Sequence, residues 1–142
     1  MWAGLARAVA GGRLTDISAA VEGVVTAEEH AYGIVDHYGG HGIGTEMHQD
    51  PHVLNHGRPG RGPRLVSGLA LAIEPMITMG SARTVELDDG WTVVTRDGSV
   101  AAHVEHSIAL LDDGVWVLTA VDGGRARLGD LVTAREPART AG

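Results

Sequence analysis

A series of short strand-like segments, each bounded by glycine, proline or aspartate turns, constrains the fold of this chain most strongly. The 142 residues include 21 glycines and 5 prolines, and these divide the apolar stretches into short runs. Alternating or β-branched runs of this length, bounded by turn residues, are typical of strands. We expect strands at residues 32–35, 69–74, 91–95, 101–111 and 115–119, with turns at 96–98 and 112–114.

Helical periodicity is confined to one segment. Apolar residues recur at helical spacing from an N-cap at Thr15 or Asp16 to about His30. Residues 1–10 are expected to be the end of a helix whose beginning is not in this chain, and they resemble neither a signal peptide nor a membrane span. The pattern predicts an α+β fold, with an antiparallel sheet and one or two helices.

Two other regions are expected to lack regular structure. Residues 49–68 are rich in proline and glycine, which predicts a long surface loop. Residues 120–142 show weak periodicity, which predicts a loosely ordered tail behind a domain at 1–119.

Charge and cysteine content exclude several classes of function. The formal net charge of −7 argues against nucleic acid and against an anionic membrane as partners. There are no cysteines, which excludes disulfides and thiolate ligands and fits a cytoplasmic protein. Any metal would therefore be bound by imidazole and carboxylate groups, which suit Co, Mn, Fe or Zn without distinguishing them.

Glu74 stands at the end of an alternating strand. Leu69, Leu71 and Ile73 are expected on one face of this strand, and Glu74 on the opposite face beside small alanines. Pro75 prevents the strand from continuing as a central one.

Three further residues could join Glu74 in a metal site. His41 lies in a glycine-rich turn, His48 follows it closely, and Glu105 lies in the predicted strand 101–111, where it shares a face with His103. Burying two unpaired glutamates is costly, so a divalent cation is their natural partner. The other histidines have no role that the sequence assigns. We expect surface or packing positions for His30, His37, His52, His56 and His103, and a packing position for His106, which follows Glu105.

Five motifs together resemble a known family. They are Gly40-His41-Gly42-Ile43-Gly44, His48 before Pro51, Ile73-Glu74-Pro75-Met76, Asp89-Gly90-Trp91-Thr92 and Glu105-His106-Ser107. In order and spacing they are similar to the carboxyl-terminal half of type I (bacterial-type) methionine aminopeptidases, which have the pita-bread fold. The resemblance runs from about Leu5 to Thr119. Aminopeptidase P and prolidase share that fold but fit these motifs less well.

The resemblance implies a role for each matching residue. His41, Glu74 and Glu105 would be metal ligands, with Glu105 bridging two divalent ions. Glu74 would also act on the nucleophilic water, and His48 would stabilise the tetrahedral intermediate at the scissile carbonyl. Trp91 would lie near the methionine side-chain pocket. The implied substrate is the N-terminal methionine of a peptide or nascent chain.

The family takes two further ligands from a pair of aspartates that lie eleven positions apart. No two aspartates among these 142 residues have that spacing. We therefore expect at most one weakly bound ion and little or no isolated activity. The chain would be either a carboxyl-terminal portion of the enzyme, with Met1 a misassigned start, or a shortened gene product. A separately encoded amino-terminal half, or self-association through exposed strand edges, would complete the fold. The alternative function is a non-catalytic pita-bread module that binds a peptide or protein.

Overall fold

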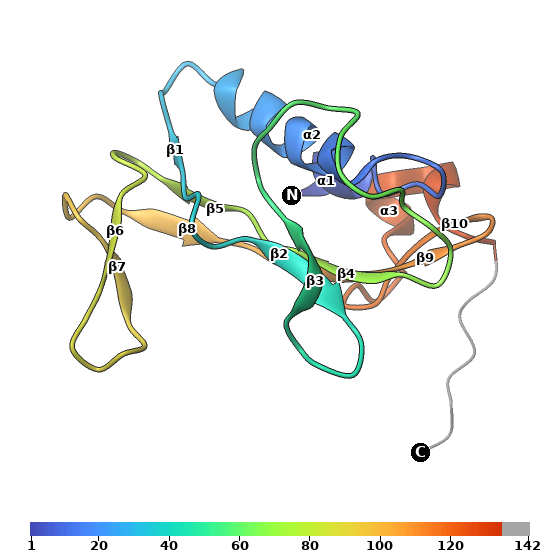
Figure 1. Ribbon diagram of the computed structural model, residues 1–142. Helices are drawn as coiled ribbons and strands as arrows, with labels where there is room; N and C mark the ends of the chain where they lie inside the picture. The colour runs from blue at the N-terminus through green and yellow to red at the C-terminus, as the bar shows by residue number, and fades with distance from the viewer. Residues whose placement is uncertain (135–142) are drawn as a thin grey trace.

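The computed structural model describes residues 1–134, in which helices lie on one face of a five-stranded antiparallel sheet (Figure 1). The helices are α1 (Trp2–Leu5), α2 (Leu14–Thr26) and α3 (Arg125–Leu128), followed by a 3-10 turn at Gly129–Leu131. The strands are β1 (Gly33–Ile34), β2 (Gly40–Ile43), β3 (Gln49–Val53), β4 (Ala70–Ile73), β5 (Met76–Thr78), β6 (Thr84–Glu86), β7 (Val93–Thr95), β8 (Ala101–His103), β9 (His106–Leu111) and β10 (Gly114–Val117). No helix among these residues is long and apolar enough to cross a membrane.

Two sheets adjoin, and three stretches of chain, β1–β2, β4–β5 and β8–β9, contribute one strand to each of them. The five-stranded sheet has the order β10-β9-β4-β2-β3, and a three-stranded sheet has the order β1-β5-β8. Because β4 continues into β5 and β8 continues into β9, β4–β5 and β8–β9 form one antiparallel ribbon with an interruption. The remaining pair, β6 and β7, forms a hairpin that projects away from both sheets (Figure 1).

The interruption in this ribbon sets the position of the two glutamates. Ile73 pairs with His106 on one side of the break, and Met76 pairs with His103 on the other. Pro75 lies in the gap and has no N–H to donate, so it cannot continue the ladder. The prediction of one strand over 101–111 is therefore wrong, since the chain divides there into β8 and β9.

Other boundaries also differ from the sequence expectations. Helix α2 begins at Leu14 and ends at Thr26, because the carboxylate of Asp16 accepts the Arg13 N–H at 2.8 Å and so stabilises an earlier start. The expected loop at 49–68 contains β3, which gains ladder hydrogen bonds from β2 that local composition does not reveal. The strands β5 and β6 were not predicted. Residues 40–43, expected as part of a glycine-rich turn, form the strand β2, because they pair with β3 and β4.

The hydrophobic core lies between the five-stranded sheet and the helices. Leu71 and Ile73 of β4 are fully buried, as the alternating pattern predicted, together with Ile108 and Leu110 of β9. Ile17 of α2 belongs to the same cluster. The α+β fold with an antiparallel sheet is thus confirmed.

The chain after Ala120 is more ordered than its composition suggests. Leu128 of α3 and Val132 are buried in the core, and Val132 forms an isolated bridge with Val115. The weak periodicity concealed this order because Leu128 and Val132 are the only buried apolar side chains in the described residues after Ala120. Residues 135–142 of the expected tail lie outside the described residues.

Asp97 fixes the β6–β7 hairpin to the loop after β5. Its carboxylate accepts the Ser81 N–H at 2.7 Å and the Ser99 N–H at 3.0 Å. The hydrogen bond from Ser81 has the largest effect, and together these hydrogen bonds lower the pKa of Asp97 to about 2. The pKa of an aspartate in the unfolded chain is about 3.9, so these hydrogen bonds stabilise the folded chain above that pH. The stabilisation is lost as the pH falls through about 2.

We expect Asp97→Asn to flatten the pH dependence of the free energy of unfolding between about pH 2 and 4. The Asp97 carboxyl resonance of the parent should titrate near pH 2. Titration at an ordinary aspartate pKa would refute the assignment.

Candidate metal site

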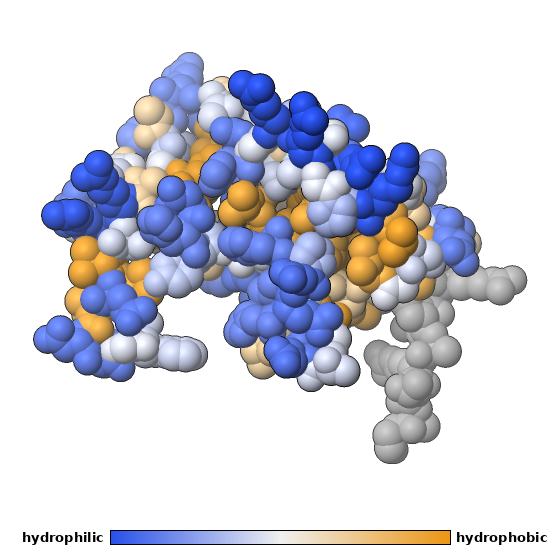
Figure 2. Space-filling model, in the orientation of Figure 1, coloured by the Kyte–Doolittle hydropathy of each residue, from blue (hydrophilic) through white to orange (hydrophobic). Residues whose placement is uncertain are grey.

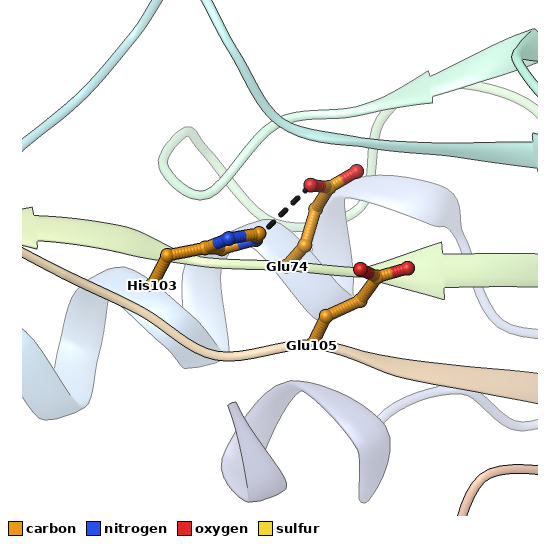
Figure 3. A group of neighbouring side chains, drawn as sticks. All are labelled: Glu74, His103 and Glu105. Atoms are coloured by element: carbon orange, nitrogen blue, oxygen red, sulfur yellow. Dashed lines mark ion pairs between the residues drawn. The ribbon is translucent and has the colours of Figure 1, made fainter. Parts of the chain in front are cut away.

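Glu74 and Glu105 lie opposite each other at the interruption of the β4–β5/β8–β9 ribbon. Glu74 follows the last residue of β4, and Glu105 precedes the first residue of β9. The Glu74 side chain is only 12% exposed, although it carries a carboxylate. Figure 3 shows the two carboxylates side by side. Two neighbouring carboxylates repel each other, so the pair favours a cation between them.

Two imidazoles approach Glu74 from different strands. The Nε2 atom of His41, on β2, lies 3.4 Å from Glu74 Oε1. The Nε2 atom of His103, on β8, lies 3.2 Å from Glu74 Oε2. The predicted proximity of His41 and Glu74 follows from strand register, because His41 pairs with Ala72 across the β2–β4 ladder.

The group with metal-ligand spacing consists of Glu74, His103 and Glu105. One ligand atom from each residue lies within 4.8 Å of the others (Figure 3). Imidazole and carboxylate donors of this kind fit a divalent ion such as Zn²⁺, Fe²⁺ or Mn²⁺. His103 is partly exposed, in keeping with the expected surface position, and it also contacts Glu74. Its position on the same strand face as Glu105 was the only sequence signal for it.

His48 lies beside His41 on the exposed connection between β2 and β3. The two imidazole rings are 4.5 Å apart, edge to face. His48 also lines a cavity that Glu74 and His103 line. Its exposure leaves the ring accessible to a molecule entering that cavity.

This cavity, of about 700 Å³, opens between the β6–β7 hairpin and the sheets. Figure 2 shows the surface hollowed beside the hairpin, with apolar side chains on the hairpin wall. Trp91 contributes to the lining but is 87% exposed. The carboxylate of Asp89 accepts the Trp91 N–H at 3.0 Å and the Thr92 N–H at 2.8 Å, which fixes the turn that carries the indole. The volume and the mixed lining suit a small organic ligand or a peptide end.

Asn55 and His106 support the site without lining it. The buried Asn55 amide donates to the Glu74 carbonyl at 3.4 Å, and so ties the β3 end to the residue after β4. The sequence offered no signal for Asn55. His106 hydrogen-bonds to the Thr119 hydroxyl at 2.7 Å and packs 4.7 Å from the Trp2 ring, as expected for a packing residue. Burial lowers the pKa of His106, against an opposing effect of the Glu105 charge.

Comparison with known proteins gives consistent results. The model of metallopeptidase family M24 matches residues 1–133. Methionine aminopeptidase 1 of Mycobacterium tuberculosis is 55% identical over 121 residues, which are 82% of this chain and 46% of that protein. The chain thus spans about half the length of the curated relatives it matches.

Solved structures give the same picture. The crystal structure of methionine aminopeptidase from Thermotoga maritima superposes with a TM-score of 0.77 at 41% identity, over 82% of this chain and 46% of that one. An X-Pro aminopeptidase from the same organism gives 0.57 at 20% identity, over 84% of this chain and 28% of that one, which shows the fold alone. The expected half of a pita-bread fold is confirmed.

Proposed function

The chain belongs to metallopeptidase family M24, and from this membership we propose that its residues form one wall of a methionine aminopeptidase site. The reaction would be hydrolytic removal of an N-terminal methionine. The observation that carries the proposal is the convergence of two carboxylates and two imidazoles at the ribbon break, on the edge of a cavity.

His41, Glu74 and Glu105 are the metal ligands in this proposal. They supply nitrogen and oxygen donors from three strands or strand ends, and the Glu74 carboxylate is mostly shielded from water. A divalent ion held there supplies Lewis acidity, which lowers the pKa of a bound water and polarises a carbonyl. Glu74 would then accept the proton that the attacking water loses.

His48 and Trp91 would act on the substrate. His48 lies next to the ligand His41 and lines the cavity, so its imidazole N–H can donate to the oxygen that gains negative charge in the transition state. Trp91 supplies a broad apolar surface at the cavity wall, which suits an unbranched thioether side chain. The substrate is thus proposed to be a peptide with an N-terminal methionine.

A complete site would need further carboxylates from the part of the relatives that this chain does not match. A pair of bridged ions carries more positive charge than Glu74 and Glu105 can neutralise. We therefore expect the 142-residue chain by itself to have little or no peptidase activity. We expect peptidase activity when the part of the relatives that this chain does not match is supplied.

The role of His48 can be tested in a fusion. The unmatched part of the M. tuberculosis relative would be placed ahead of residues 1–142, and methionine release from Met-Gly-Met would be measured. We expect His48→Ala to lower kcat by about 10²–10³-fold, because it removes a donor to the developing charge. Metal affinity should stay unchanged. The control His37→Ala removes a largely exposed imidazole that does not line the cavity, and it should have no effect. Equal loss of activity in both variants would refute the role.

A further inference from the structure

His103 contacts the same carboxylate as His41, the histidine that the family resemblance assigns as a ligand. It lies on β8 at the edge of the β1-β5-β8 sheet, and its side chain is 46% exposed. Its Nε2 atom contacts Glu74 Oε2, whereas that of His41 contacts Oε1. Figure 3 shows the His103 imidazole directed toward Glu74, with Glu105 beside them.

These separations agree with shared coordination of one ion. Two ligands at about 2.1 Å from a tetrahedral ion lie about 3.4 Å from each other. The His103–Glu74 distance is 3.2 Å, and the ligand atoms of Glu74, His103 and Glu105 all lie within 4.8 Å of one another. Glu105 is exposed, so its side chain has room to adjust toward an ion that Glu74 and His103 contact.

We propose that His103 is a metal ligand of this chain, and that its Nε2 atom binds the same divalent ion as Glu74 and Glu105. The inference rests on the proposed function for the roles of these two glutamates, and it adds a residue to which the family motifs assign nothing.

The nitrogen ligand that His103 adds should change which divalent ion the site prefers. Imidazole favours zinc, iron or nickel, whereas carboxylates alone favour magnesium or manganese. His103 should therefore shift the preference of the site from manganese toward zinc.

The test is calorimetric titration of the 142-residue chain with ZnCl₂ and, separately, with MnCl₂. We expect His103→Gln to weaken zinc binding by at least about tenfold, the lower bound for disturbing a metal site, and to affect manganese less. The control His37→Gln also removes one imidazole, but from a side chain that is 77% exposed and outside the group, and it should bind zinc like the parent. Unchanged melting curves would show that both variants fold.

A second measurement on the unaltered protein does not depend on the variants folding. Zinc should shift the side-chain ¹⁵N resonance of His103 Nε2 at one molar equivalent. If His103→Gln binds zinc as tightly as the parent, or this resonance does not move, the inference is wrong and the proposed ligands His41, Glu74 and Glu105 remain. If the parent binds neither ion, the inference fails together with the metal assignment of the proposed function.

Discussion

Replacing Glu74 by glutamine is expected to remove nearly all divalent-ion binding by this chain. Both His41 and His103 contact the Glu74 carboxylate, which belongs to the group with ligand spacing. Glutamine keeps the shape but loses the charge and one acceptor oxygen. Affinity should fall by at least about 100-fold, the upper end of what loss of a supporting group costs. Titration with Zn²⁺ or Mn²⁺ measures this directly.

Glu86→Gln is the matched control for this change. Glu86 lines the same cavity but does not belong to the group with ligand spacing. Its loss lowers the negative charge of the cavity equally and should leave affinity within a small factor. If both variants weakened binding to the same degree, the effect would be general electrostatics, and Glu74 would not be a ligand.

Replacing Gly40 by alanine is expected to destabilise the fold and to displace His41. A Cβ at position 40 would overlap the carbonyl oxygen of Ala72 on β4 and press against Val53 on β3. Because β2 lies between these two strands, it cannot move away from one without approaching the other. We expect a loss of about 1–3 kcal/mol in the free energy of unfolding, the usual cost of overpacking. Metal affinity should also fall, since His41 follows directly.

Gly23→Ala provides the comparison for Gly40→Ala. Gly23 lies inside α2, and a Cβ there meets no atom within 4 Å. Alanine should raise stability by about 0.5–1 kcal/mol through its better helix propensity. Urea unfolding followed by circular dichroism measures both variants. A Gly40→Ala protein as stable as the parent would show that β2 is not packed as described.

The part of the site that could be predicted from sequence is the part encoded by local pattern. Alternation over residues 69–74, ended by Pro75, placed Leu71 and Ile73 in the core and Glu74 at a strand end, as the structure has them. The turn at 112–114 likewise joined β9 and β10. Each of these depends on residues only a few positions apart.

Features that depend on distant pairing were not predictable from local pattern. The division of 101–111 into β8 and β9 arises because Pro75, on the partner strand, interrupts the ladder opposite it. β3 and β6 exist because of their partners β2 and β7. The contact of His103 with Glu74 was not predicted for the same reason, since it spans this interruption and no motif marks His103.

The most direct test of the account is methionine release from Met-Gly-Met, measured with a divalent ion for the 142-residue chain and for the fusion described above. We predict little or no release by the chain alone, clear release by the fusion, and loss of that release in the fusion carrying Glu74→Ala. The account would be contradicted by a folded fusion that binds metal through Glu74 and releases no methionine, or by Glu74-dependent turnover of the chain alone at the rate of the fusion.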